Sequence, residues 1–214
     1  MQHGRQAPIG TEIRWIPLVL RIFLPFSSAY FLSYLLRNIN AVIAPELAHD
    51  FDLDAGQLGS LTSAYFLGFA IMQIPIGVYL DRFSPSAVQA SLYSLAAAGA
   101  YLFSLAHTPS QLLAARLIIG VGVAAGLVAG LKAIVLWFPK DRVPLANGAL
   151  IAVGTLGAVA ATAPTEWLLT GMDWRHLFRV IAICCALVAI SVVTLFPKTG
   201  GITRPSQSGS GLRG

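Results

Sequence analysis

The chain has 214 residues, of which 56% are hydrophobic and only 11% are charged, and its mean hydropathy is +0.73. This composition excludes an ordinary soluble domain and favours a protein that lies mostly inside a membrane. The net charge of +5 comes mainly from Lys and Arg residues that flank apolar segments, so it does not indicate nucleic-acid binding.

Six apolar segments, each long enough to cross a bilayer as a helix, follow one another along the chain. Their predicted ranges are 17–44, 57–80, 87–106, 112–138, 144–168 and 177–196. We therefore expect an all-α integral membrane protein with six transmembrane helices. The membrane domain would occupy residues 15–197, between a cytoplasmic segment at 1–14 and a disordered, Gly/Ser/Pro-rich cytoplasmic tail at 198–214.

Positive charges mark one side of the predicted bundle, while the carboxylates gather on the other side. These basic residues are Arg5, Arg14, Arg21, Arg82, Lys140, Arg142, Lys198, Arg204 and Arg213. Because basic loops stay in the cytoplasm, we expect both termini there and the protein in the inner membrane of the cell. A cleaved signal peptide is not favoured, because the first apolar run is too long and no small-residue cleavage site follows it.

Four polar side chains share one face of the first predicted helix. Tyr30, Ser33, Arg37 and Asn40 recur every three or four residues, which places them within a sector of about 80°. A polar stripe inside a membrane span faces protein or water rather than lipid, so these residues are candidates for binding a solute. The alternative is that the span ends near residue 36 and Arg37 only reaches out to the membrane surface.

The stretch Glu46–Asp54 is acidic and is expected to form a short outer loop. His49 lies among these carboxylates, but a single histidine in a loop is not the pattern of a metal site. The adjacent Cys184 and Cys185 lie inside an apolar segment and are interpreted as packing residues. We therefore predict no bound metal.

A polar turn, Gly77–Phe83 (GVYLDRF), is predicted between the second and third helices. It resembles the signature loop of the major facilitator superfamily, Gly-x-Leu-Ala-Asp-Arg-x-Gly followed by basic residues. Gly77, Asp81 and Arg82 match this pattern, whereas Ser84 replaces the second Gly and no basic residues follow. The resemblance implies that Asp81 and Arg82 latch one conformational state, and the missing basic residues imply a weaker latch than the family pattern.

The resemblance extends to Arg37. Organic-anion members of the superfamily carry an Arg in a Tyr-x-x-Arg setting with Ala-Pro some residues on, and YLLRNINAVIAPEL at residues 34–47 is similar. Leu36 stands where those members often have Asp. The resemblance thus implies that Arg37 lines a cavity and holds an anion.

The fourth segment carries two basic residues inside the predicted span. Arg116, Gly120 and Gly122 match the second motif of the superfamily, Arg-x-x-x-Gly-x-Gly, which implies a gating role. The alternative for Arg116 is that it reaches the outer membrane surface. Lys132 lies deeper and is expected to share solute binding with Arg37, unless it extends to the cytoplasmic surface about 10 Å away.

One face of the fifth span consists of small residues and proline. Gly154, Gly157, Ala161 and Pro164 lie on this face and predict close contact with a neighbouring helix. Glu166 near the outer end is interpreted as a hydrated rim residue rather than a coupling carboxylate.

Landmarks in the first three spans recur in the last three. The spacings are 95 positions for Arg37 and Lys132, 94 for Pro45 and Pro139, 94 for Gly77 and Gly171, and 92 for Asp81 and Asp173. Because each copy has three spans, the copies are inverted in the membrane, a design of secondary transporters. We expect two inverted three-helix repeats, half of the superfamily fold, with equivalent roles for Arg37 and Lys132.

These features favour the N-terminal half of a secondary carrier that moves a small anionic organic solute by alternating access, with no cofactor. The resemblance implies a second six-helix bundle, supplied either by another half or by a homodimer.

Two other classes of protein compete with this interpretation. An intramembrane protease needs a Ser with a His base inside the membrane. His3, His49, His107 and His176 all fall in the tail or in loops and no His-Glu-x-x-His is present, so we do not expect an enzyme. A truncated or non-transporting membrane protein that acts only as a partner is the alternative that the sequence leaves open.

Overall fold

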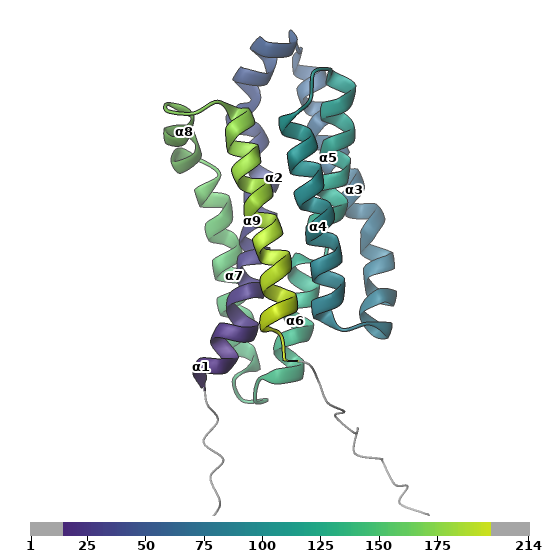
Figure 1. The fold of residues 1–214 in the computed structure, drawn as a ribbon, viewed down its shortest axis with the longest axis vertical. Coiled ribbons are helices and arrows are strands. Elements are labelled where there is room, and N and C mark those ends of the chain that lie inside the picture. Colours follow the sequence, from purple (N-terminus) through teal and green to yellow (C-terminus); the bar gives the residue numbers. More distant parts are fainter. Residues whose placement is uncertain (1–14, 198–214) are drawn as a thin grey trace, which may run out of the picture.

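The computed structural model describes residues 15–197, which form a bundle of six helical passes (Figure 1). The first pass comprises α1 (Trp15–Leu18), the π-helical η1 (Val19–Phe23) and α2 (Leu24–Phe51), and the next two are α3 (Ala55–Arg82) and α4 (Pro85–Ser104). The others comprise α5 (Pro109–Val123) with α6 (Gly126–Trp137), α7 (Val143–Ala160) with α8 (Ala163–Leu169), and α9 (Trp174–Leu195). Figure 1 shows α1 and the last turn of α9 at the same end of the bundle. The predictions for residues 1–14 and 198–214 lie outside the described residues.

Polar caps determine where several helices begin. The Asp54 carboxylate accepts the backbone N–H of Gln57 at 2.7 Å, and the Gln57 side-chain oxygen accepts the backbone N–H of Asp54 at 2.9 Å. This reciprocal pair satisfies two free donors at the start of α3. Ser84 and Thr108 cap α4 and α5 in a simpler way, each followed by a proline that suits the first helical turn. Consecutive passes are therefore antiparallel and joined by short turns.

Two stretches predicted as loops are largely helical, so those predictions were wrong. Within Glu46–Asp54, α2 continues to Phe51, and within Gly77–Phe83, α3 continues through Arg82. A helix of 28 residues such as α3 is about 42 Å long, whereas the hydrocarbon core of a bilayer is about 30 Å thick. The polar ends of the helix extend past the apolar layer, and composition alone does not show that the helix continues there.

Five of the described passes have the length and hydropathy of membrane spans. The remaining pass, α4, has 20 residues but is richer in small and polar side chains. It packs against both α5 and α9, and Gln89, Tyr93 and Ala96 are completely buried. The predicted six-helix fold is confirmed, with α4 facing mainly protein.

Helices of the two repeats approach closely at glycines. A Cβ atom on Gly68 of α3 would overlap the carbonyl oxygen of Leu117 in α5, and one on Gly157 of α7 would overlap that of Phe31 in α2. Gly154 packs on the ring of Tyr30. The close contact predicted for the fifth pass is therefore confirmed at Gly154 and Gly157, whereas Pro164, predicted on the same face, is exposed.

These matched contacts relate the first pass to the fourth by 86 positions, from Phe31 to Leu117. Gly68 and Gly157 relate the second pass to the fifth by 89 positions, and the spacings of 92–95 read from charged and proline landmarks stay a prediction.

Candidate functional site

Arg37 projects from α2 toward the middle of α3. Its guanidinium carbon lies 4.8 Å from the ring centre of Phe69, 5.0 Å from that of Tyr34 and 5.8 Å from that of Phe66. Phe69 is near the midpoint of α3, so this cation lies about 20 Å from either end of that helix. The guanidinium is therefore held at the middle of α3 and not at either end of that helix.

The charge of Arg37 has no carboxylate partner within the described part of the chain. The ion pairs found there join His49 to Asp50, Lys132 to Asp81, and Arg142 to Asp141. Arg37 is half-buried, its Nε atom is buried without a hydrogen-bond partner among residues 15–197, and the Tyr65 hydroxyl lies beside the guanidinium. The guanidinium is thus surrounded by aromatic rings and a hydroxyl group but lacks a charged partner among these residues, which is a costly arrangement for a cation away from water.

Tyr30 and Ser33, predicted on the same binding face, are buried against other helices. The Tyr30 ring packs on Gly154 and meets the Tyr34 ring edge-on, with 5.0 Å between ring centres. The Ser33 hydroxyl donates to the carbonyl oxygen of Val123 at 3.3 Å. The stripe does face protein, but these two side chains tie helices together.

Arg116 is 1% exposed, so the alternative in which it reaches the membrane surface was wrong. Its Nη2 donates to the Asn40 side-chain oxygen at 2.7 Å and its Nη1 to the Leu36 carbonyl oxygen at 3.2 Å. The guanidinium carbon lies 4.7 Å from the ring centre of Phe103 and 5.4 Å from that of Phe178. Arg116 thus links α5 to α2, one helical turn from Arg37, and holds Asn40 in place.

The motif glycines differ in their surroundings. A Cβ atom on Gly120 would overlap the carbonyl oxygen of Tyr65, so this glycine permits the close approach of α5 to α3. A Cβ atom on Gly77 would meet nothing within 4 Å. Arg82 is exposed at the last residue of α3.

Lys132 is not brought to Arg37. Its ammonium donates to the Leu80 carbonyl oxygen and lies 3.4 Å from the Asp81 carboxylate. Residue 81 is about 18 Å along α3 from Phe69. The structure therefore joins Lys132 to the predicted latch and separates it from the predicted anion site.

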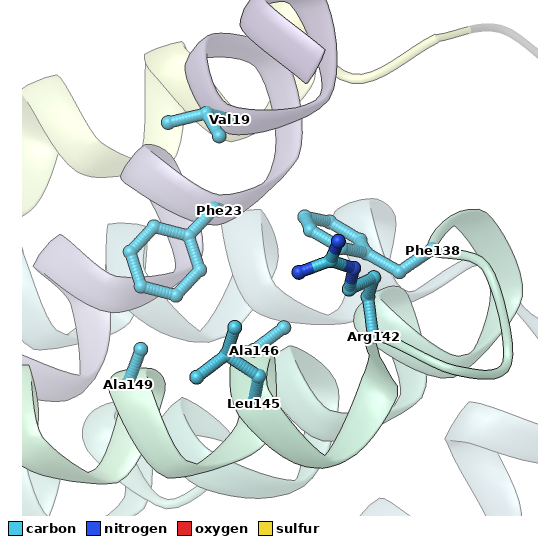
Figure 2. A pocket seen from close by; sticks show the side chains of 7 residues that line it. All are labelled: Val19, Phe23, Phe138, Arg142, Leu145, Ala146 and Ala149. Atoms are coloured by element: carbon cyan, nitrogen blue, oxygen red, sulfur yellow. The ribbon is translucent and has the colours of Figure 1, made fainter. Parts of the chain in front are cut away.

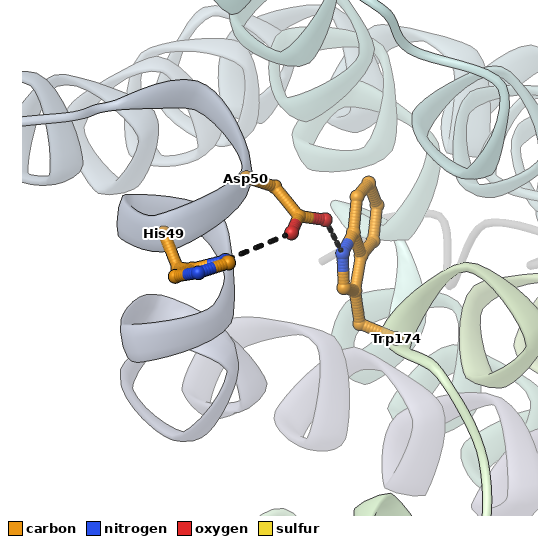
Figure 3. Close-up of polar contacts among 3 residues, drawn as sticks. All are labelled: His49, Asp50 and Trp174. Carbon is orange, nitrogen blue, oxygen red and sulfur yellow. Dashed lines mark hydrogen bonds and ion pairs between the residues drawn. The ribbon is translucent and has the colours of Figure 1, made fainter.

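At the opposite end of the bundle, Asp50 of α2 binds the first residue of α9. Its carboxylate accepts the indole N–H of Trp174 at 2.9 Å, with a ring nitrogen of His49 3.5 Å away (Figure 3). A cavity of about 710 Å³ beside them is lined also by Glu46 and Asp173. Within residues 15–197, no three His, Cys, Asp or Glu side chains are grouped so that they could hold a metal ion.

A second cavity, of about 450 Å³, opens between η1 and α7 at the end of the bundle where α1 lies (Figure 2). Its lining residues are Val19, Phe23, Phe138, Arg142, Leu145, Ala146 and Ala149. Figure 2 shows Arg142 extending beside Phe138 over an otherwise apolar surface.

A third space, which we term the α3 groove, follows the half of α3 that begins near Asp54. It has a volume of about 710 Å³ and is lined by Ser60, Thr62, Ser63, Ala64, Phe66 and Leu67. Phe66 lines this groove and is also one of the three rings around Arg37, so the groove begins next to the ring that separates it from the guanidinium.

Sequence reasoning missed the aromatic rings at the site. Tyr34 is one turn from Arg37 on α2, and Phe66 and Phe69 share a face of α3 at a spacing of three residues. The spacing is visible in the sequence, but nothing in the sequence links that face to Arg37. Their contact depends on the crossing of α2 and α3.

Comparison with known proteins shows what kind of protein this is. The family profile described as Major Facilitator Superfamily matches residues 26–211. The chain belongs to this superfamily. It is accordingly a multi-pass membrane protein, and its six passes correspond to half of the superfamily fold.

Curated relatives in the superfamily are longer. An uncharacterized transporter of Bacillus subtilis, YybO, is 30% identical over 164 residues, which are 77% of this chain and 38% of that protein. The hexuronate transporter of Escherichia coli K12 is 30% identical over 149 residues, 70% of this chain and 34% of the relative. The chain thus spans well under half the length of these superfamily members.

A solved structure shares the fold of this chain. It is the bacterial homolog of the human lysosomal transporter Spinster, in an inward-facing and unoccupied conformation. The TM-score is 0.72 at 21% sequence identity, and the match covers 87% of this chain and 46% of the other.

Proposed function

We propose that this chain is the N-terminal half of a secondary carrier that moves small organic anions across a membrane by alternating access. The observation that carries the proposal is Arg37, a half-buried guanidinium near the middle of the bundle without a carboxylate partner among residues 15–197. A guanidinium offers five donors in a fixed fork that suits a carboxylate or phosphate, and its attraction to an anion is stronger away from bulk water.

Three further features support the proposal. The superfamily relatives include a protein named as a hexuronate transporter, and a hexuronate is an organic anion. The Asp81–Lys132 pair joins two passes at the end of the bundle where α1 lies, which suits a latch between conformations. Arg82, Lys140 and Arg142 lie at that same end, and this basic group favours cytoplasmic termini in an inner membrane. Arg175 and Arg179 lie near the start of α9, at the other end.

The proposed carrier needs a second bundle, because alternating access comes from one bundle rocking against another. That partner is a second six-helix half or a second copy of this chain. No step requires a cofactor or a catalytic side chain. The competing function is that of a membrane protein that only partners another.

Uptake by reconstituted vesicles tests the proposal. The chain is reconstituted alone, and separately with the protein encoded next to it in the genome, and entry of labelled glucuronate and benzoate is followed. We expect uptake of an organic anion in at least one reconstitution and its loss in Arg37→Ala. Uptake in neither preparation would favour the partner-only function, and uptake that Arg37→Ala leaves intact would remove Arg37 from the mechanism.

A further inference from the structure

We infer that the site at Arg37 selects organic anions with an aromatic or otherwise apolar body over polyhydroxylated acids. The inference rests on the proposed function, because it assigns a substrate class to the same arginine.

Three aromatic rings flank the guanidinium of Arg37. Tyr34, Phe66 and Phe69 place their ring centres 4.8–5.8 Å from the guanidinium carbon, and 44% of the Phe66 residue surface is exposed. A carboxylate binds the edge of a guanidinium through its N–H groups, so the rest of the ligand lies beside these rings. Aromatic bodies pack favourably on such rings by edge and offset contacts.

The α3 groove gives the body of the ligand a direction. From Phe66 it continues past Leu67 and Ser63 toward Ser60, along the half of α3 that begins near Asp54. The body of a ligand whose carboxylate binds Arg37 therefore meets the apolar side chains of Phe66 and Leu67 first.

The hydroxyl groups of the α3 groove are already engaged within the protein. Ser60 donates to the Gly56 carbonyl oxygen and Ser63 to that of Gly59, each at 3.0 Å. The Thr62 hydroxyl oxygen accepts the Asn40 amide at 2.8 Å. A sugar acid would give up hydrogen bonds to water for its hydroxyl groups and would find only the lone pairs of Ser60 and Ser63 and the Thr62 O–H to replace them, whereas an aromatic acid gives up none.

Binding of two monoanions of similar size separates these classes. Benzoate and D-glucuronate are titrated into the chain in lipid nanodiscs, with heat as the readout. We expect benzoate to bind wild type at least tenfold more tightly. Phe66→Leu and Phe69→Leu should each weaken benzoate about two- to tenfold, which is the scale of one lost aromatic pair, and weaken glucuronate less than benzoate.

Phe83→Leu is the matched control. Phe83 is an exposed ring beyond the end of α3, paired with Tyr79 at 6.3 Å between ring centres and remote from Arg37. It should leave both affinities unchanged, and equal melting temperatures of the three leucine variants in nanodiscs exclude a folding defect.

The outcomes distinguish the inference from the proposed function. Glucuronate binding that equals or exceeds benzoate binding, and that Arg37→Ala abolishes, would overturn the inference and leave the function standing. The absence of binding of either anion, or binding that Arg37→Ala does not change, would overturn both. A benzoate preference that Phe66→Leu and Phe69→Leu do not reduce would also overturn the inference.

Discussion

The ammonium of Lys132 lies 3.4 Å from the carboxylate of Asp81 and also donates to the Leu80 carbonyl oxygen. The contact joins α6 to the last turn of α3. The Asp81 side chain is 85% exposed and that of Lys132 is 32% exposed, so the pair contributes little to folding. A contribution of about 1 kcal/mol is nevertheless enough to shift a conformational equilibrium about fivefold.

We therefore expect Asp81→Asn to leave the melting temperature nearly unchanged and to alter the transport rate about two- to fivefold. Because the family resemblance assigns Asp81 to a latch, the expected direction is a decrease. The measurement is the initial uptake rate in the transporting preparation, normalised to the protein inserted.

The charge-swapped double variant Asp81→Lys with Lys132→Asp is the control for the pair itself. The double variant restores the attraction between residues 81 and 132 but not the hydrogen bond to the Leu80 carbonyl oxygen. We therefore expect its uptake rate to lie between that of wild type and that of each single variant. A double variant whose uptake rate does not exceed that of either single variant would show that Asp81 acts without Lys132.

Arg116 provides a second prediction, on stability. Arg116→Met leaves the buried Asn40 side-chain oxygen and the Leu36 carbonyl oxygen without their donor. Each unpaired buried acceptor costs about 1–3 kcal/mol, partly offset because a buried cation is removed. We expect a lower melting temperature, by about 2–4 °C for each kcal/mol lost, in circular dichroism of the detergent-solubilised chain. Arg179→Met, on an exposed position of α9, is the matched control and should melt like wild type.

Topology provides a third prediction, because the basic residues favour cytoplasmic termini. Reporter fusions should alternate outside and inside in the order Asp54, Asp81, Pro109, Lys140, Asp173 and Lys198. An alkaline phosphatase reporter, active only outside the cytoplasm, should thus report the first, third and fifth positions. Two successive fusions on the same side would contradict the six-pass arrangement, and a complete inversion would contradict the orientation alone.

Hydrophobic periodicity and composition were sufficient for the number of passes and the close contact at Gly157, and the motif resemblance at Asp81 and Arg116 was sufficient for the superfamily, because each is a local pattern in the sequence. The predicted ends of α2 and α3 were wrong. Both helices continue past the apolar layer into polar residues such as Asp81, and the backbone geometry of the helix does not change there. The repeat spacings of 92–95 stay a prediction, because the glycine contacts give 86 positions between the first and fourth passes and 89 between the second and fifth. The position of a charged residue such as Lys132 depends on its own polar contacts, whereas the glycines at helix crossings are required by the close packing of two helices.

The candidate site was predicted only in part. The position of Arg37 was readable from its polar stripe and its family resemblance. Its surroundings were not readable, because Phe66 and Phe69 belong to another helix and meet the guanidinium only through the tertiary crossing. The same holds for Arg116, whose burial depends on Asn40 and two rings from separate helices.

The central claim is that Arg37 is the main anion-binding residue, and it is tested most directly by the affinity of the chain in nanodiscs for organic anions in Arg37→Lys and Arg37→Ala. Losing a charge-assisted hydrogen bond costs about 1.5–3 kcal/mol, or roughly ten- to a hundredfold in affinity. Lys keeps the charge without the planar fork, so it should bind weakly, and Ala should not bind measurably. Arg21→Ala, at an exposed position of η1, is the matched control and should bind as wild type does. Equal affinities for wild type, Arg37→Lys and Arg37→Ala would contradict the account.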